Sequence, residues 1–267
     1  MSKRVVVLTG DQLRHNFFRK ALAQCNGIEV LASYCEVKPD IPVTDQSEFA
    51  RRHLELRTLS EQDFFGIFDR LTPDLTNPIF VKTGAINEQK TVEDIINLQP
   101  DVLVAYGCSL VKSELLEEFK GRFLNVHLGL SPYYRGTATN FWPLVNNEPE
   151  CVGATFMYID AGVDTGEIIH QIRADIHSGD SPHDIGNRLI SIIPETYAQI
   201  ITKLDEIKTQ PQPVLNREEK YYKRKDYSDD AVRQMYRNFE KGMIDEYLAQ
   251  RIQMNTKTPI VKNSVLS

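Results

Sequence analysis

Short apolar runs alternate with helix-periodic segments along the first half of the chain, and this alternation most constrains the fold. The predicted strands are 4–9, 27–34, 79–82, 101–106 and 123–126. The predicted helices are 13–25, 46–71, 91–98 (capped by Thr91, with an acidic first turn) and 113–119. Such alternation predicts an α/β fold with a Rossmann-like, doubly wound and mostly parallel sheet. Sheets of this kind bind ligands at the carboxyl ends of their strands.

The pattern of residues in the second half of the chain indicates a domain boundary followed by a helical appendage. A long helix is expected over 181–207, capped by Ser181 or Asp180, and Pro211 and Pro213 follow it. A basic, aromatic turn then precedes one amphipathic helix over 228–252, and the last dozen residues are expected to be loose or lightly docked. We therefore predict a main domain of residues 1–207 and a C-terminal extension of residues 208–267. The roles of the extension and of the charged segment 36–77 stay open.

Composition excludes several classes of protein. No apolar run approaches the roughly 20 residues that span a bilayer, and the first apolar run is a strand rather than a signal peptide. The net charge of −6 disfavours broad nucleic-acid binding. The four cysteines contain no CxxC pair, so no metal site is expected and reduced thiols in a cytoplasmic protein are the better interpretation.

One polar constellation lies where predicted strands give way to loops. Asn125 and His127 are two residues apart on a strand, so their side chains point to the same side. An amide and an imidazole are suitable donors to an oxygen that becomes negatively charged, and an imidazole also moves protons near neutral pH. Asp164, between glycines in AGVDTG, could hold His127 in its cationic form or accept a proton from an amine. Each residue alone is more often turn chemistry or a satisfied histidine, so the prediction depends on their occurring together.

The segments LNVHLGLSPYYRG and GATFMYIDAGVDTGEII resemble the signature of the folate-dependent formyltransferases. The resemblance covers residue 4 to about 207 in outline and 101–171 in detail. It implies the formyltransferase fold, with 1–207 as the catalytic domain and with Asn125, His127 and Asp164 as the catalytic trio. One departure concerns the residues after the histidine, which are Pro-Ser or Pro-Ala in many members and Leu128-Gly129 here.

The resemblance also implies a co-substrate, N10-formyltetrahydrofolate, and no metal. The residues implied to bind it precede the Asn-x-His strand or lie in the loop before the aspartate: Ala105, Tyr106, Gly107, Cys108, Ser109, Leu110, Ile159, Asp160, Ala161, Gly162 and Val163.

The acceptor amine is less determined. A helix N-terminus with basic side chains can hold a phosphate, and the aromatic and basic groups of the loop and tail could hold a nucleotide. The candidate acceptor residues are therefore Gly10, Asp11, Arg14, His15, Tyr133, Tyr134, Arg135, Gly136, Tyr222 and Lys223. A plain strand-to-helix turn and a solvated basic turn are the simpler interpretations of these segments.

The sequence thus predicts an N-formyltransferase acting on small molecules, with a nucleotide-linked amino sugar of surface polysaccharide biosynthesis as the favoured acceptor. The alternatives are formyltetrahydrofolate hydrolysis, or formyl transfer to methionyl-tRNA or glycinamide ribonucleotide. Neither a nucleic acid nor a membrane is an expected partner, and the apolar stripe of the tail helix makes a homodimer plausible.

Overall fold

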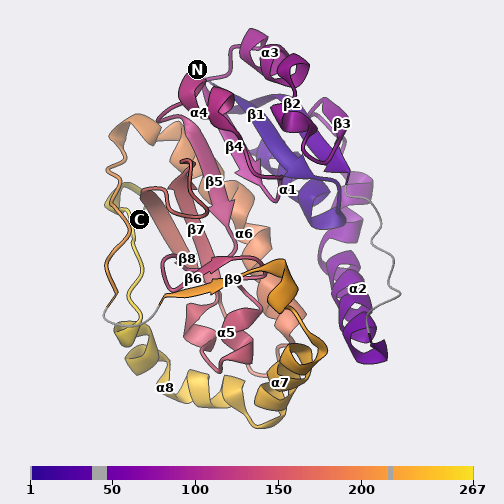
Figure 1. Cartoon of the computed structure of the whole chain (residues 1–267), viewed down its shortest axis with the longest axis vertical. Coiled ribbons are helices and arrows are strands. Elements are labelled where there is room, and N and C mark those ends of the chain that lie inside the picture. The colour runs from indigo at the N-terminus through magenta and orange to yellow at the C-terminus, as the bar shows by residue number, and fades with distance from the viewer. Residues whose placement is uncertain (1, 38–46, 216–218, 267) are drawn as a thin grey trace.

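A seven-stranded sheet runs through the molecule in the order β3-β2-β1-β4-β5-β7-β8 (Figure 1). Residues 2–37, 47–215 and 219–266 are described in the computed structural model of this chain. Strands β1 to β5 pair in parallel, whereas β7 pairs antiparallel with both β5 and β8. The strands are β1 (Lys3–Gly10), β2 (Ile28–Val37), β3 (Pro78–Lys82), β4 (Val102–Tyr106), β5 (Phe123–His127), β7 (Gly153–Tyr158) and β8 (Ile168–Arg173). The predicted mostly parallel α/β sheet is confirmed.

Helices cover both faces of this sheet because the buried side chains of its inner strands alternate between them. On β1, Val5 and Val7 belong to one apolar cluster, whereas Val6 and Leu8 belong to another. Helices α1 (Leu13–Gln24), α2 (Glu48–Leu71) and α6 (Pro182–Thr202) cover the first face. The other face carries η2 (Ala85–Asn87), α3 (Gln89–Asn97) and α4 (Ser113–Glu118).

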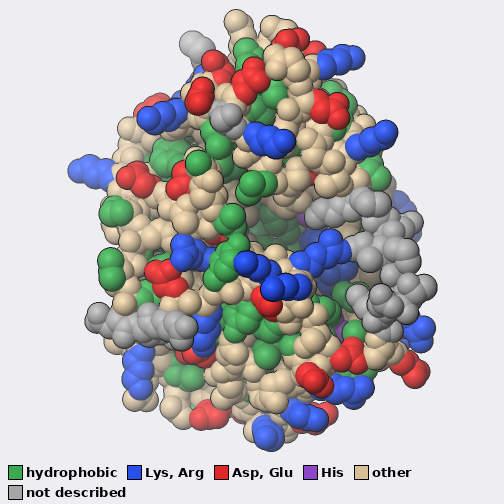
Figure 2. All heavy atoms as spheres, in the orientation of Figure 1, with side chains coloured by type: hydrophobic (Ala, Val, Ile, Leu, Met, Phe, Trp, Pro, Cys, Tyr) green, Lys and Arg blue, Asp and Glu red, His purple; other side chains and the backbone are tan. Residues whose placement is uncertain are grey.

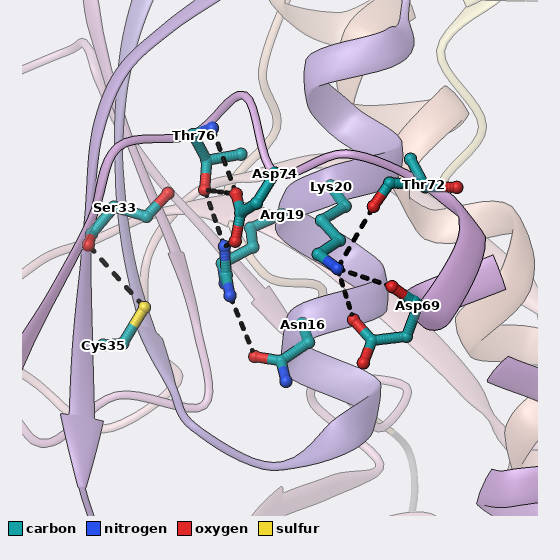
Figure 3. Close-up of polar contacts among 9 residues, drawn as sticks. All are labelled: Asn16, Arg19, Lys20, Ser33, Cys35, Asp69, Thr72, Asp74 and Thr76. Atoms are coloured by element: carbon teal, nitrogen blue, oxygen red, sulfur yellow. Dashed lines mark hydrogen bonds and ion pairs between the residues drawn. The ribbon is translucent and has the colours of Figure 1, made fainter. Parts of the chain in front are cut away.

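Helix α1 is fixed to the segment between α2 and β3 by charged groups (Figure 3). The guanidinium of Arg19, only 3% exposed, donates to the carboxylate of Asp74 and to Thr76 Oγ1 at 2.7 Å. Lys20 Nζ lies 2.9 Å from Asp69 Oδ1. Breaking a buried pair of this kind is costly, so the second half of α1 is held firmly against the end of α2 and the segment that leads into β3.

Most of the remaining elements form a smaller layer at the lower end of the view in Figure 1, whereas residues 204–206 lie at the upper end, where Asp205 pairs with Lys3 at the start of β1. Strand β6 (Tyr134–Gly136) pairs in parallel with β9 (Lys220–Tyr222), which joins the loop after β5 to the C-terminal segment. The helices are α5 (Trp142–Val145), η3 (Pro149–Cys151), η4 (Leu204–Glu206), η5 (Arg224–Asp226), α7 (Asp229–Glu240), α8 (Met243–Lys257) and η6 (Ser264–Leu266).

Several predicted boundaries were wrong, for local reasons. Helix α3 begins at Gln89 after Glu88, so Thr91 lies inside it and its first turn carries no acid. Helix α6 has Ser181 as its cap but ends at Thr202, ahead of the short η4. The start predicted for α2, Gln46, lies outside the described residues.

The C-terminal segment also differs from the prediction. The single helix expected over 228–252 is two helices, because Gly242 adopts a left-handed conformation (φ 87°) that ends α7 and begins α8. For the last dozen residues, expected to be loose or lightly docked, the described part is docked. Residues 261–263 lie beside β8, where the backbone N–H of Gln171 donates to Val261 O at 2.7 Å and Asn263 is 8% exposed.

Candidate active site

Asn125 and His127 lie at the carboxyl end of β5, between β4 and the antiparallel β7. The imidazole of His127 is 7% exposed, and its Nδ1 lies 3.1 Å from Asp164 Oδ1. Its Nε2 lies 3.2 Å from the carbonyl oxygen of Tyr134. Both neighbours only accept hydrogen bonds, so a ring N–H directed to either of them makes a hydrogen bond.

Asp164 joins the loop after β7 to the loop after β5. It has φ 53°, a left-handed conformation that aspartate tolerates, and its Oδ2 accepts a 3.1 Å hydrogen bond from Gly136 N. Burial alone would raise the pKa of Asp164, but the charge and hydrogen bond of His127, the Gly136 N–H and the charge of Arg135 hold that pKa below its usual range. The carboxylate is therefore ionised at neutral pH and orients the imidazole.

The departure at Leu128-Gly129 has a steric reason. A Cβ atom on Gly129 would lie 2.7 Å from His127 Nε2 and 2.7 Å from Thr139 Cβ. Any larger residue at this position would displace the ring, so the glycine permits the close packing of the loop against His127.

A cavity of about 160 Å³ lies on the side of the trio that the loops after β4 and β7 enclose. Asn125 and Asp164 line it. The predicted co-substrate residues that also line it are Ala105, Gly107, Cys108, Ser109, Leu110, Ile159, Asp160, Gly162 and Val163. Tyr106 and Ala161 do not; Tyr106 points to the opposite side of β4, where its ring packs edge-on against Phe18. The further lining residues are Val111, Met157, Tyr158, Thr165 and Gly166.

Glu36 holds the loop after β4 that forms one wall of this cavity, and no sequence motif marks this residue. Its side chain is fully buried at the end of β2. Its Oε2 accepts from Ser109 N at 2.5 Å, and its Oε1 accepts from Ser109 Oγ at 2.7 Å and from Gly84 N at 2.6 Å. One carboxylate thus fixes the backbone of the loop after β4.

A second, larger cavity of about 490 Å³ lies on the other side of the trio. Asn125, His127 and Asp164 line it together with Gly107 and Cys108. Three predicted acceptor residues lie here, namely Arg14, His15 and Gly136. Because Asn125 and Asp164 line both cavities, the trio stands at the junction between them.

The other predicted acceptor residues serve the local packing. Tyr133 and Tyr134 are buried, and their hydroxyls contact Pro259 O at 2.8 Å and the Glu148 carboxylate. Tyr222 stacks on Trp142 at 4.0 Å. In the part of the chain that the structure describes, these three and Arg135, Lys223, Gly10 and Asp11 line neither cavity. Arg135 pairs with Glu219, and the Lys223 backbone N–H donates to Asp226. Gly10 packs on the His15 ring, and Asp11 is half-buried.

The described residues form neither a metal site nor a membrane-spanning helix. Among the described residues, no three His, Cys, Asp or Glu side chains lie together as a metal site would require. None of the helices formed by these residues is long and apolar enough to cross a membrane.

The family model and the curated relatives that match this chain are all formyltransferases. The family model described as formyl transferase matches residues 4–201. A methionyl-tRNA formyltransferase of Clostridioides difficile (strain 630) is 34% identical over 147 residues, which are 54% of this chain and 46% of that protein. The chain thus spans about half the length of the curated relatives it matches.

Solved structures share the fold at lower identity. The formyltransferase PseJ from Anoxybacillus kamchatkensis, in complex with UDP-4,6-dideoxy-4-formamido-L-AltNAc and tetrahydrofolate, superimposes with a TM-score of 0.50 at 20% identity, covering 87% of this chain and 97% of that one. Glycinamide ribonucleotide transformylase 1 from Symbiobacterium toebii gives a TM-score of 0.54 at 19% identity, covering 79% and 95%.

Proposed function

The chain belongs to the formyl transferase family, and from that premise we propose that Asn125, His127 and Asp164 transfer a formyl group from N10-formyltetrahydrofolate to an amine. The proposal is supported by the position of the trio between the two cavities. Asn125 and Asp164 line both cavities and His127 lies between them, so a formyl donor in one cavity and an amine in the other would meet at the trio.

The smaller cavity suits the donor. Its walls combine apolar side chains such as Leu110 and Ile159 with the exposed backbone of the two loops, a mixture that fits a flat heterocycle carrying polar edges. We place the pterin of N10-formyltetrahydrofolate there, with the formyl group directed toward Asn125.

Each residue of the trio then has its own role in the reaction. As the amine nitrogen bonds to the formyl carbon, the formyl oxygen gains negative charge. The Asn125 amide donates to that oxygen, and so does His127 when its Nε2–H turns from the Tyr134 carbonyl to the formyl oxygen. The ionised Asp164 orients the His127 ring through Nδ1 and accepts the proton that the amine loses. The bond from the formyl carbon to N10 breaks, and N10 takes up a proton to give tetrahydrofolate.

A nucleotide-linked amino sugar is the acceptor that we favour. The larger cavity is roomy, and the structural neighbour PseJ was solved with a UDP-linked formamido sugar. The curated relatives make methionyl-tRNA the second candidate. Against it stands the net charge of −6, since binding to a phosphate backbone requires cationic surface.

The experiment is a transfer assay with N10-formyltetrahydrofolate and a panel of acceptors: nucleotide-linked amino sugars, glycinamide ribonucleotide and methionyl-tRNA. We expect a mass gain of one formyl group on an amino sugar. Folate turnover without any acceptor would favour the hydrolase instead, and transfer only to methionyl-tRNA would refute the favoured acceptor.

Within that assay, His127→Ala should lower kcat on the order of 10²- to 10³-fold, because it removes a donor to the charged oxygen and leaves Asp164 without its partner. His177→Ala is the matched control, since the His177 side chain is 57% exposed and pairs with Asp175 at the surface, away from both cavities. Full activity in the His127 variant would refute the mechanism.

A further inference from the structure

Strand β6 contacts both members of the His127–Asp164 pair. The carbonyl oxygen of Tyr134 lies 3.2 Å from His127 Nε2, and the Gly136 N–H donates to Asp164 Oδ2 at 3.1 Å. Among the described residues, β6 pairs with no strand of the seven-stranded sheet. The placement of these two side chains relative to each other therefore depends on what holds β6.

The strand that holds β6 is β9, which belongs to the C-terminal extension. The backbone N–H of Lys220 donates to Tyr133 O at 3.1 Å, and that of Thr137 donates to Tyr222 O at 2.8 Å. The two strands lie so close that a Cβ atom on Gly136 would be 2.1 Å from Tyr222 O. Because glycine has no side chain, it permits this approach. The position of β6 is thus set from the C-terminal extension.

Buried side chains add a second connection between the two strands. Tyr134 is fully buried, and its hydroxyl donates to the Glu148 carboxylate. Lys220 Nζ donates to Tyr134 Oη at 3.2 Å and lies 2.9 Å from Glu148 Oε1. Asn146 Nδ2 donates to Tyr134 Oη at 3.0 Å and to Tyr222 Oη at 2.9 Å. Because hydrogen bonds to charged groups are strong in a buried setting, this network fixes the residue whose carbonyl faces the imidazole.

Gln212 holds the other member of the pair. Its Nε2 donates to Asp164 O at 2.7 Å and to Gly166 O at 3.1 Å, so one amide joins two carbonyl groups of the loop that carries the carboxylate. Asp164 has φ 53°, a conformation that persists where the surrounding contacts define it. Gln212 supplies two of these contacts.

The placement of Gln212 is itself restricted by its neighbours. Pro211 and Pro213 flank it, and a proline fixes its own φ and favours an extended conformation in the residue before it. Just before them, Gln210 forms an antiparallel bridge with Ile168 at the start of β8, through hydrogen bonds of 2.8 and 3.0 Å. The two prolines, which indicated a domain boundary in the sequence, thus direct a polar side chain to the loop before β8.

In the space-filling view a hollow opens near the centre of the molecule, and Lys and Arg side chains lie along its lower side, where Figure 1 places β6 and β9 (Figure 2). We propose that Gln212, Lys220 and Tyr222 are positioning residues for formyl transfer, an inference that rests on the proposed function. Gln212 holds the Asp164 loop. The other two hold β6 and, through it, the resting orientation of His127. These three described residues line neither the smaller nor the larger cavity, so they act through the pair.

The first test is spectroscopic and needs no substrate. Gln212→Met and Lys220→Met keep a similar side-chain length and remove the hydrogen-bond donors. The ring ¹⁵N resonances of His127, assigned by their loss in His127→Ala, report the contacts of its two nitrogens. We expect both variants to shift these resonances and to leave those of the other histidines in place. A variant in which the His127 resonances do not move overturns the role of the substituted residue.

The second test is the transfer assay. In each variant kcat should fall about ten- to a hundredfold, with a smaller change in KM for the amine, because a displacement of about 1 Å in a catalytic group is enough for such a loss. If Lys220→Met melts below the assay temperature, Tyr222→Phe replaces it, since that change removes only the hydroxyl that Asn146 contacts. Unchanged kcat in the variants would overturn the inference.

Matched controls remove the same side chains elsewhere. Gln250→Met and Lys241→Met change exposed positions on α8 and directly after α7, and both should keep the parent kcat and the parent His127 resonances. The melting temperature of each variant reports its folding. A lower melting temperature with unchanged kcat and unchanged His127 resonances would show that the contacts stabilise the fold only, which also overturns the inference.

The two tests separate this inference from the proposed function. If the His127 resonances move in the variants but the parent formylates no amine, the proposed function fails and the positioning contacts stand. If the parent formylates an amine and the variants do so equally well, the proposed function stands and the positioning role is refuted.

Discussion

At the scale of single residues, the site depends on what each ring nitrogen faces. His127 has a carboxylate on one side and a carbonyl oxygen on the other, and both of these groups accept hydrogen bonds. His183 and His53 lie in contact, with ring centroids 4.6 Å apart, and their environment favours the neutral form. One residue type thus faces two hydrogen-bond acceptors at the trio and a buried setting that favours its neutral form between α2 and α6.

This difference predicts acid sensitivity. The pKa of His53 is about 3 and that of His183 about 4 in the folded chain, against about 6.5 when unfolded. Between these values the unfolded chain binds protons that the folded chain does not, so stability falls as the pH drops below about 6.5. At pH 5.5 each histidine should cost about 1 kcal/mol.

Urea unfolding at pH 7.5 and pH 5.5 measures the effect. A His53→Gln/His183→Gln double variant should lose about 2 kcal/mol less than the parent over this interval. Parallel losses in the two proteins would show that these histidines do not titrate on unfolding as expected.

At the scale of elements, the smaller cavity depends on residues at the carboxyl ends of β2, β4 and β5. The loop after β4 forms one wall of the smaller cavity, and its position depends on Glu36 at the end of β2 rather than on its own sequence. Glu36 touches neither cavity directly, so we assign it a positioning role.

Glu36→Gln should therefore weaken the binding of N10-formyltetrahydrofolate in the smaller cavity. The amide would place an NH₂ group against N–H or O–H donors, weaken the charged hydrogen bonds, and release the loop. We expect KM for N10-formyltetrahydrofolate to rise about tenfold with a smaller change in kcat, a difference of about 1.4 kcal/mol in binding. Glu29→Gln, at an exposed position of the same strand, is the control; equal steady-state kinetics in both variants would exclude the positioning role.

At the scale of the whole molecule, the C-terminal segment is tied to the loop that supports the trio. Gln171 on β8 donates to Ser131 O at 2.7 Å, and its Oε1 accepts from Val261 N at 2.8 Å. Asn263 Nδ2 donates to Ile169 O at 3.3 Å and to Lys208 O at 3.0 Å. We propose that residues 1–207 form the catalytic domain and that 208–267 act as an extension that braces it.

Asn263→Ala tests this brace. The variant leaves buried carbonyl groups without donors, so the free energy of unfolding should fall by about 2 kcal/mol and the melting temperature by about 5 °C. Lys257→Ala, at an exposed position of α8, should change neither. If Asn263→Ala melts like the parent, the docked segment contributes nothing to the stability of the domain.

Local patterns in the sequence determined the five parallel strands and most of the helices, because burial on two faces imposes apolar runs and helical periodicity that can be recognised in the chain itself. The antiparallel strands β7 and β8 were not predicted. The Asn-x-His spacing placed two polar side chains on one side of a strand end, since side chains alternate along a strand. The order of motifs likewise indicated the family.

Only the tertiary structure decided what lies around these residues. Tyr133 and Tyr134, candidates for acceptor binding, are buried, whereas Glu36 and Gln212 hold loops around the trio without any motif. These residues come from segments far apart in the chain, and no local pattern records which of them meet. The physical reason is that a cavity is formed by the packing of several elements, so its donors, acceptors and charges exist as a set only once the chain has folded.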